Sequence, residues 1–446
     1  MTTHSQLLPY EAARSGPLKG SVRVPGDKSI SHRALMFGAL ASGKTEITGL
    51  LKAGDVLGTA DVLRKLGVPI EQLGQGHWRV LGRGVGGLTE PVDDLDFGNS
   101  GTGTRLMLGV LAGHGFAARL TGDASLSRRP MGRVLKPLKQ MGLQVLDGDK
   151  STLPLTIRGR SQPIPITYTL DVPSAQVKSA ILLAGLAAPG QTTVIEHEAT
   201  RDHTERMLRH FGAAIDVVEI PGGRAITVKG NAELRGRDVI VPSDPSSAAF
   251  LIAAGAIVPG SDVTVVGVLT NPTRTGFYQT LREMGAGIVF LNERIEGGEP
   301  IADIRVRASH LHAVRVPPER APSMIDEYPI LAVVAAAAVG TTRMEGLAEL
   351  RAKESDRLSA TASGLAVNGV IARVEGDALE VEGRTGIFGG GTVATYLDHR
   401  IAMAFLVLGL VAQKPVTVDD TAMIATSFPQ FTGLMTGLGA IIRPKA

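Results

Sequence analysis

The sequence predicts an α/β (α+β) protein with two domains, and three observations support this fold class. The chain has 446 residues, which is too long for one ordinary hydrophobic core. Apolar, nearly uncharged helical stretches alternate with short β-rich runs along its length. This alternation is organised as six copies of one unit, and an internal repeat of this kind constrains the whole fold.

Each unit begins with a small or acidic residue that leads into an apolar helix. The six starting positions are Ser29, Ser100, Ser174, Ser246, Asp326 and Asp398. A β-rich run follows, and then a second helix pattern closes on a glycine before another apolar run. Those glycines are Gly67, Gly142, Gly212, Gly285, Gly369 and Gly439. A unit therefore contains a strand, a helix, a strand, a helix and one or two strands. Because one such unit cannot bury both helices alone, we expect two domains of three units each.

Val-Pro pairs mark the entry to four of the units. Proline ends a strand and fits the first turn of the following helix. The pairs are Val24-Pro25, Val172-Pro173, Val241-Pro242 and Val316-Pro317. The third pair lies in the middle of the chain, so residues 240–244 are expected to cross from one domain to the other.

Composition excludes several classes of function. The 46 basic and 43 acidic side chains leave a net charge of only +3, and aromatic residues make up 4% of the chain. Nucleic-acid binders usually carry a basic surface, and single-strand binders add stacking aromatic residues. The chain has no cysteine, which excludes disulfides, thiolate nucleophiles and zinc–thiolate sites. No nucleic-acid partner is therefore expected.

The sequence also predicts a cytoplasmic protein without a membrane partner. The first residues, MTTHSQLLPYEAARSG, lack the apolar core of a secretory signal. The most apolar stretch, residues 330–340, is far shorter than the roughly 20 residues that a membrane span needs.

Residues 38–45 (GALASGKT) fit the P-loop pattern, but we reject a P-loop enzyme. That phosphate cradle works only between a strand and a following helix. Here the match follows a helix pattern and precedes a β-rich run, so Lys44 is predicted to be an exposed turn residue.

Cations occur at several helix starts, where the helix dipole disfavours them. They are Lys28, Arg33, Arg105, Lys178 and Arg400. Any one of them alone is best explained as a surface cation beside an acidic neighbour. Together they predict an anion-binding site shared by the two domains. The segment SLSRRPMGR adds Arg128, Arg129 and Arg133.

Two further features of the helix starts could bind a ligand but also have a purely structural explanation. The loop NSGTGT (99–104) is small enough for the backbone to approach a ligand, although it also fits an ordinary glycine-rich helix entry. Gln176 is a polar residue in the first turn of an apolar helix, where it could equally cap the backbone.

Two carboxylates stand out as candidate acid–base groups. Glu354 is predicted on the same helical face as Leu350, Leu358 and Leu365, where burial would raise its pKa and suit a general acid. The alternative is a partly buried salt-bridge cluster with Lys353 and Arg357. Asp326 precedes a strongly apolar helix. It could serve the chemistry or form a capping box with Ser323.

The motifs together resemble the 5-enolpyruvylshikimate-3-phosphate synthase family. PGDKSISHR, NSGTGTR, RRPMGR, SAQVKSA, SMIDEYP, LRAKESDRL and LDHRIAM occur in that family's order over nearly the whole chain. GDASLSRRPMGR, MIDEYPILAV and IATSFP resemble its bacterial class II branch most. The resemblance implies an inside-out α/β barrel in each domain, built from three βαβαββ units, with the active site in the interdomain cleft. It assigns residues 25–241 to one domain and residues 1–24 plus 242–446 to the other.

The resemblance also implies roles for individual residues. Shikimate 3-phosphate would contact Lys28, Ser29, Arg33, Ser174, Ala175, Gln176, Arg201, Asp326 and Lys353. Phosphoenolpyruvate would contact Lys28, Gly101, Arg129, Gln176, Arg357 and Arg400. Asp326, Glu354 and Lys28 would be catalytic. No metal or cofactor is expected, and the enzyme would act as a monomer that closes around its substrates. Thr426 departs from the family, because many relatives carry a phosphoenolpyruvate-binding lysine there.

The implied reaction joins phosphoenolpyruvate to the 5-hydroxyl of shikimate 3-phosphate and releases phosphate, a step toward chorismate and the aromatic amino acids. Glu354 would protonate the methylene carbon, and Asp326, with Lys28, would take or orient the hydroxyl proton. The absence of a side chain at Gly101 would leave room for the inhibitor glyphosate. Two rivals remain: a cell-wall enolpyruvyl transferase acting on UDP-N-acetylglucosamine, and a non-catalytic binder of phosphorylated metabolites.

Overall fold

The computed structural model describes residues 8–384 and 386–445, which divide into two compact units. Unit 2 consists of Gly26–Pro242 together with the short segment Ile295–Glu299. Unit 1 consists of the chain up to Pro25, Ser243–Arg294 and the chain from Pro300 onward. The division predicted from the sequence places residues 295–299 in the other half of the chain, so their membership in unit 2 is a departure from it.

Unit 2 contains six α-helices among the described residues. They are α1 (Lys28–Leu40), α2 (Gly54–Lys65), α3 (Gly101–Ala112), α4 (Gly132–Gln140), α5 (Ala175–Gly185) and α6 (His203–His210), with the 3-10 turn η1 (Leu126–Arg128) before α4. Its strands are β3 (Ala41–Thr48), β4 (Ile70–Gly74), β5 (His77–Arg83), β6 (Leu95–Asp96), β7 (Ala117–Thr121), β8 (Gln144–Val145), β9 (Leu155–Arg158), β10 (Thr167–Thr169), β11 (Gln191–Glu196), β12 (Ile215–Ile220), β13 (Gly223–Lys229), β14 (Leu234–Arg235) and β15 (Val239–Ile240).

Unit 1 also contains six α-helices in its described part. They are α7 (Pro245–Ile257), α8 (Gly276–Glu283), α9 (Tyr328–Ala336), α10 (Arg357–Val367), α11 (His399–Gly409) and α12 (Phe431–Gly437), with 3-10 turns η2 (Pro272–Arg274), η3 (Pro318–Ser323), η4 (Ala348–Ala352) and η5 (Ala422–Thr426). Its strands are β1 (Tyr10–Ala13), β2 (Lys19–Val22), β16 (Asp262–Leu269), β17 (Gly287–Glu296), β18 (Glu299–Arg307), β19 (Arg315–Val316), β20 (Gly340–Met344), β21 (Ile371–Glu375), β22 (Ala378–Gly383), β23 (Thr392–Val393), β24 (Val416–Val418) and β25 (Ile441–Pro444).

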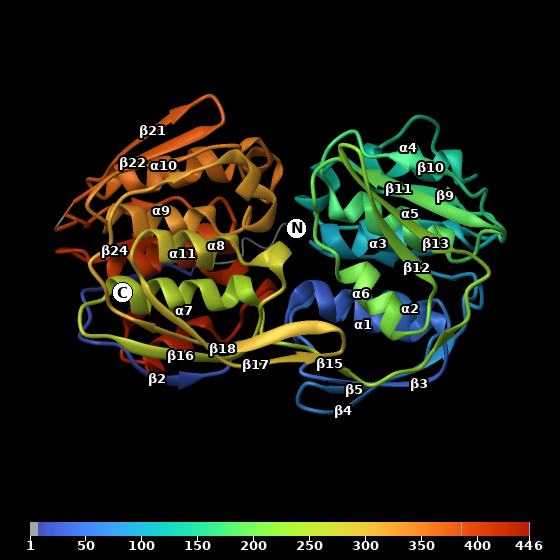
Figure 1. Ribbon diagram of the computed structural model, residues 1–446, viewed down its shortest axis with the longest axis horizontal. Helices are drawn as coiled ribbons and strands as arrows, with labels where there is room; N and C mark the ends of the chain where they lie inside the picture. Colours follow the sequence, from blue (N-terminus) through green and yellow to red (C-terminus); the bar gives the residue numbers. More distant parts are fainter. Residues whose placement is uncertain (1–7, 385, 446) are drawn as a thin grey trace, which may run out of the picture. The chain divides into compact units, whose positions relative to one another are not determined.

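Each unit is built from three small mixed sheets around buried helices (Figure 1). In unit 1 the sheets have the strand orders β17-β18-β16-β2, β19-β20-β22-β21 and β23-β24-β1-β25. In unit 2 the orders are β14-β3-β5-β4, β6-β7-β9-β8 and β10-β11-β13-β12, and β15 also pairs with β3. A typical sheet joins one parallel pair, such as β10 and β11, to antiparallel neighbours.

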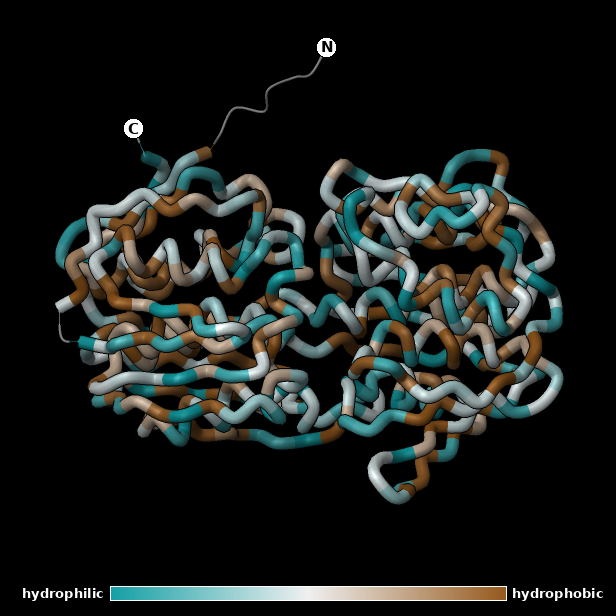
Figure 2. The backbone as a smooth tube through the Cα atoms, turned by 90° about the horizontal axis from the view of Figure 1, so that it is seen from above, coloured by the Kyte–Doolittle hydropathy of each residue, from teal (hydrophilic) through white to brown (hydrophobic). Residues whose placement is uncertain are grey.

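The first helix of each repeat lies at the centre of its unit. In unit 1, α7, α9 and α11 contact one another, and α9 and α11 are buried along their whole length. A helix without a polar face must be enclosed on all sides, which places the sheets outside. Hydrophobic stretches accordingly run through the interior of each unit (Figure 2). Helices inside and sheets outside confirm the predicted α/β fold class in two units.

The N-terminal strands belong to sheets of the C-terminal half. β1 pairs with β24 and β25, and β2 runs parallel to β16. In Figure 1 the dark blue β2 lies beside β16. The chain then enters unit 2 at Gly26, so the start of α1 directly follows the crossing between the units.

Two local expectations are settled by the fold. Residues 38–45 run from the end of α1 into β3, which is the order that excludes a P-loop. The expectation that Lys44 lies in a turn was wrong: it is an exposed residue within β3, and its ammonium pairs with Glu46 at 3.0 Å. In the part of the chain that the structure describes, no helix combines the length and apolar character needed to cross a membrane.

Candidate active site

The predicted site residues fall into two groups, one in each unit. The unit 2 group comprises Lys28, Ser29, Arg33, Gly101, Arg129, Ser174, Ala175, Gln176 and Arg201. The unit 1 group comprises Asp326, Lys353, Glu354, Arg357 and Arg400. Most members of both groups lie at or just before helix N-termini, where unpaired backbone N–H groups attract anions.

Helix α1 presents Lys28 and Arg33 from its first turns. Asp27 caps the helix by accepting a hydrogen bond from the Ile30 N–H at 2.7 Å. The Lys28 ammonium pairs with Asp55 of α2 at 3.0 Å, and both side chains are largely buried. Asp55 is a partner that the sequence analysis missed, although an acidic residue in the first turn of a helix is a common signal.

Arg33 is buried and is fixed by neutral partners. Its Nε donates to the Thr204 hydroxyl at 2.8 Å, and one terminal nitrogen donates to Ser179 at 2.9 Å. Burial lowers the pKa of Arg33 and outweighs the opposing effect of the negative charge on Glu205, so that the pKa is about 10. The positive charge of Arg201, just before α6, also contributes to lowering the pKa of Arg33. A buried cation held mainly by hydroxyl groups is well suited to an anionic ligand.

Gln176 and Arg129 connect the starts of α3, α4 and α5. The Gln176 carbonyl accepts from Arg105 at 3.0 Å, and its amide donates to Thr102 at 3.0 Å. Arg129 donates to the Asn99 side chain at 2.7 Å. Gln176 therefore does not cap the backbone, whereas Ser100 of the glycine-rich loop caps α3 by accepting from the Gly103 N–H at 3.1 Å.

Gly101 lies directly against these arginines. A Cβ atom at this position would be 3.0 Å from Nη1 of Arg105 and 3.2 Å from Nη1 of Arg129. Both distances are shorter than ordinary van der Waals contact. The missing side chain thus lets two guanidinium groups approach the start of α3.

Lys178 does not belong to the anion-binding cations. Its ammonium is fully buried and pairs with Glu205 at 2.7 Å and with Glu196 at 3.1 Å. Two carboxylates already neutralise this charge, so the expectation that Lys178 faces a ligand was wrong.

Arg357 is the centre of the unit 1 group. Its guanidinium is 1% exposed and donates to Asp398 at 2.8 Å, to Asp326 at 3.1 Å and to Glu354. Burial opposes the charge, but the charges of Asp398, Glu354 and Asp326 outweigh it and raise the pKa of Arg357 above its ordinary value. Lys353 approaches the same Asp326 oxygen at 3.5 Å. Asp326, Lys353, Glu354 and Arg357 therefore form one ion-pair cluster, and Arg400 is placed more loosely, with its Nε 4.0 Å from Asp326.

Glu354 does not lie on a helical face. It lies between η4 and α10, because Asp356 caps a helix that starts only at Arg357. The prediction of a helical stripe through Glu354 was wrong, and the half-buried carboxylate takes part in the ion-pair cluster that was its alternative. The capping box proposed for Asp326 and Ser323 is also absent among the described residues, since α9 begins after Glu327 without a side-chain cap.

Two members of the cluster were missed by the sequence analysis. Asp398 was noted only as a helix start, yet its buried carboxylate both caps α11 and holds Arg357. Glu327 is buried beside Arg400, with 3.6 Å between its Oε1 and Nη1 of the arginine. At Thr426 the hydroxyl donates to the Met423 carbonyl at 2.7 Å, so it closes its own turn.

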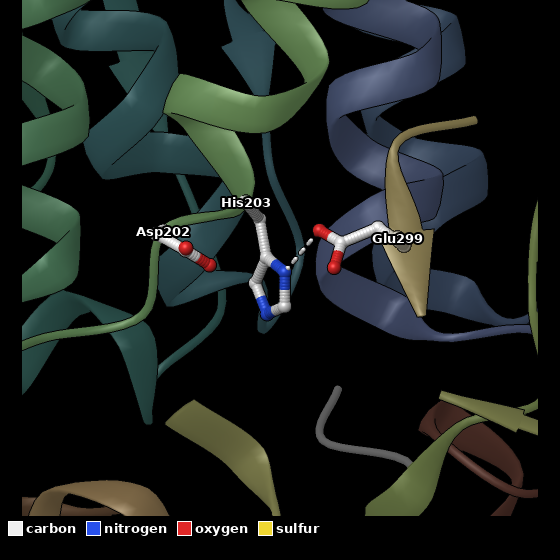
Figure 3. A group of neighbouring side chains, drawn as sticks. All are labelled: Asp202, His203 and Glu299. Carbon is white, nitrogen blue, oxygen red and sulfur yellow. Dashed lines mark hydrogen bonds and ion pairs between the residues drawn. The ribbon is translucent and has the colours of Figure 1, made fainter. Parts of the chain in front are cut away.

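A separate cluster in unit 2 has the composition of a metal site. Ligand atoms of Asp202, His203 and Glu299 lie within 4.8 Å of one another (Figure 3). However, Nε of Arg206 lies 2.8 Å from Asp202 and 3.9 Å from Glu299. This guanidinium already supplies positive charge to both carboxylates, so the cluster is best described as an ion-pair network that attaches Glu299 to α6.

Comparisons with known proteins agree with this geometry. The family described as EPSP synthase (3-phosphoshikimate 1-carboxyvinyltransferase) matches residues 12–435. A 3-phosphoshikimate 1-carboxyvinyltransferase from Parvibaculum lavamentivorans is 61% identical over 96% of both chains. Another from Cereibacter sphaeroides is 59% identical over 99% of both. An EPSP synthase structure from Acinetobacter baumannii superposes with a TM-score of 0.88 at 45% identity, covering 98% of this chain and 100% of that one.

These matches span both units and include every segment that carries the two groups of residues. They confirm the family expected from the order of the sequence motifs. The chain is therefore a member of the EPSP synthase (3-phosphoshikimate 1-carboxyvinyltransferase) family.

Proposed function

We propose that this chain is the enzyme that transfers the enolpyruvyl group of phosphoenolpyruvate to the 5-hydroxyl of shikimate 3-phosphate and releases phosphate. This is a step of the shikimate pathway, which leads to chorismate and the aromatic amino acids. Membership in the family supports the activity. The observation that carries the mechanism is the Arg357 cluster, in which one buried cation holds three carboxylates beside two further cations.

Both substrates carry phosphate and carboxylate groups, so bringing them together requires several positive charges. The cations of the two groups would supply them without a metal ion or an organic cofactor. Orienting two anions in this way contributes to rate through proximity and through electrostatic stabilisation of developing charge. Shikimate 3-phosphate would be bound by Lys28, Ser29, Arg33, Ser174, Ala175, Gln176, Arg201, Asp326 and Lys353. Phosphoenolpyruvate would be bound by Lys28, Gly101, Arg129, Gln176, Arg357 and Arg400.

The ion pair between Glu354 and Arg357 suggests how a carboxylate becomes a general acid. When the anionic groups of phosphoenolpyruvate take the N–H groups of Arg357, Glu354 loses its cationic partner and gains a negative neighbour. Both changes raise the pKa of a carboxyl group, so Glu354 would bind a proton as the substrate arrives. The proton would then be available at the methylene carbon.

The chemical steps follow from that protonation. Glu354 delivers its proton to the methylene carbon, and the central carbon becomes an oxocarbenium-like electrophile. The 5-hydroxyl oxygen attacks this carbon, and its proton passes to Asp326, with Lys28 assisting. The tetrahedral intermediate then breaks its carbon–oxygen bond to phosphate, and the leaving phosphate takes the proton held by Asp326. The methyl carbon returns a proton to Glu354, which restores the carbon–carbon double bond.

The test is a phosphate-release assay in which each substrate is omitted in turn, with and without EDTA. Release that needs both substrates and continues in EDTA is the expected result. Release with UDP-N-acetylglucosamine in place of shikimate 3-phosphate would show that the chain catalyses the cell-wall reaction instead. Tight calorimetric binding of shikimate 3-phosphate without any release would indicate a binding protein.

We also propose that the enzyme acts as a monomer in the cytoplasm. The complete absence of cysteine in 446 residues fits a reducing compartment. Light scattering coupled to size-exclusion chromatography should give the 46.6 kDa of one chain, and a mass twice that value would contradict the proposal.

A further inference from the structure

Glu327 is a buried acid that the reaction described above does not use. It follows Asp326 directly in the chain, and its residue is 3% exposed. Its Oε1 accepts a hydrogen bond from the Ser246 hydroxyl and lies 3.6 Å from Nη1 of Arg400. Its other oxygen, Oε2, is buried and accepts no hydrogen bond from the described part of the chain. A buried carboxylate with an unused oxygen costs stability, which calls for a functional explanation.

The Ser246 hydroxyl also contacts a second buried charged residue. Arg274, at the end of η2, donates to the Ser246 hydroxyl at 2.9 Å and lies 3.9 Å from Asp244, the cap of α7. Ser246 therefore receives a hydrogen bond from Arg274 and donates its own to Glu327. This relay holds the same Glu327 oxygen, Oε1, that lies nearest to Arg400.

Arg400 lies between two neighbouring carboxylates. Its Nη1 donates to the Asp326 backbone carbonyl at 3.3 Å, and its Nε is 4.0 Å from the Asp326 side chain. Without a competing charge, the guanidinium would close the remaining distance and form a full ion pair with the Asp326 side chain. That pair would use the N–H groups proposed to bind phosphoenolpyruvate.

We propose that Glu327 is a positioning residue that acts through Arg400. Its fixed carboxylate draws the guanidinium away from the side chain of Asp326, so that Arg400 keeps N–H groups for phosphoenolpyruvate. This inference rests on the proposed function, because it assumes that Arg400 binds that substrate.

The test compares steady-state kinetics of Glu327→Gln and Glu327→Asp with the unaltered enzyme. Glutamine keeps the shape and the contact with Ser246 but removes the charge. We expect Glu327→Gln to raise the KM for phosphoenolpyruvate about tenfold and to lower kcat, with the KM for shikimate 3-phosphate within about twofold. Glu327→Asp, which keeps the charge, should recover part of the loss.

Two further variants provide an independent test of the Glu327 contact and a control. Ser246→Ala removes the hydroxyl that donates to Glu327 and accepts from Arg274, and it should raise the KM for phosphoenolpyruvate by about threefold even if Glu327→Gln folds poorly. Asp262→Asn removes a carboxylate–arginine pair elsewhere in unit 1, where Asp262 binds Arg305 at 2.6 Å, and should leave both KM values unchanged.

The outcomes separate this inference from the proposed function. Equal changes in both KM values, or lowered melting temperatures with unaltered kinetics, would show a purely structural role and overturn the inference alone. If the unaltered enzyme releases no phosphate from the two substrates, the proposed function itself fails.

Discussion

Gly101 shows how one absent side chain shapes a binding site. Because a Cβ atom there would lie 3.0 Å from Arg105 and 3.2 Å from Arg129, we expect Gly101→Ala to displace these two side chains. The variant should raise the KM for phosphoenolpyruvate several-fold and weaken inhibition by glyphosate more strongly, since both need the same space. Inhibition constants measured with and without the substitution check this.

A matched control is available on α12. Gly433 has nothing within 4 Å of an added Cβ, so Gly433→Ala should leave both constants unchanged. Micromolar inhibition of the unaltered enzyme is expected. If Gly101→Ala has no larger effect than Gly433→Ala, the space at Gly101 does not govern inhibitor binding.

Glu354 and Asp326 are expected to differ in the steps they serve. Glu354→Gln cannot deliver a proton, so kcat should fall by about 10² to 10⁴, the usual contribution of general acid–base catalysis. Asp326→Asn should also lower kcat, because the hydroxyl proton loses its acceptor. Single-turnover rates for each variant measure these losses. Near-normal turnover in Glu354→Gln together with a large loss in Asp326→Asn would exclude the proposed division of roles.

The sequence offered a salt-bridge cluster only as the alternative explanation for Glu354, and the structure shows that Asp326, Glu354 and Arg357 belong to one such cluster. For Asp326 the local pattern left a helix cap equally open, and its catalytic role was implied only by the family resemblance. The helical stripe through Glu354 failed because Leu350 and Leu358 belong to different elements, separated by the cap at Asp356. A periodic pattern continues across such a break, whereas the backbone hydrogen bonds do not.

At the scale of the elements, His32 connects three helices of unit 2. It is buried in α1, with its Nδ1 2.8 Å from the Thr59 hydroxyl of α2 and its Nε2 3.4 Å from Ser100, the cap of α3. Burial lowers the pKa of His32 from 6.5 to about 3. The side chain is therefore neutral in the folded protein at neutral pH.

This shift predicts a loss of stability on the acidic side. Below pH 6.5 an exposed histidine in the unfolded chain binds a proton that the folded chain does not bind until about pH 3, so acid favours unfolding across this window. His32 alone contributes a slope of about 1.4 kcal/mol per pH unit in the lower part of that window. Urea unfolding at pH 7.5 and 5.0 should show a smaller pH dependence in His32→Gln.

The exposed His310 provides the comparison for that experiment. His310→Gln should retain the acid slope of the unaltered protein. An unchanged slope in His32→Gln would mean that other groups control acid stability.

Helix α5 is attached to its neighbours through the buried charge of Lys178. Its ammonium joins α5 to Glu196 of β11 and Glu205 of α6. Lys178→Met would leave two carboxylates near each other without this cation, so we expect a loss of about 3 to 5 kcal/mol in unfolding free energy. Chemical denaturation measures it, and a change below about 1 kcal/mol would contradict the expectation. The sequence could not reveal this role, because both carboxylates come from later segments of the chain.

At the scale of the whole molecule, the six-fold repeat was the most informative part of the sequence. Five of the six predicted starting positions coincide with helix caps or lie within the first turn: Ser29, Ser100, Ser174, Ser246 and Asp398. The central helices could be predicted because they lack any polar face. The pairing of β1 and β2 with strands of the C-terminal half could not be derived from periodicity, since strand partners are chosen by tertiary packing.

The segment Ile295–Glu299 has a consequence for how such genes can recombine. This short loop comes from a later part of the sequence than the rest of unit 2. Nδ1 of His203 lies 2.8 Å from Oε1 of Glu299, and Arg206 donates to the Gly298 carbonyl. A chimaera that exchanges only residues 26–242 between two relatives would combine one parent's His203 and Arg206 with the other parent's loop. Functional chimaeras should therefore take residues 26–242 and residues 295–299 from the same parent. Unit 2 is compact in space, but the two segments that encode it are separated in the gene.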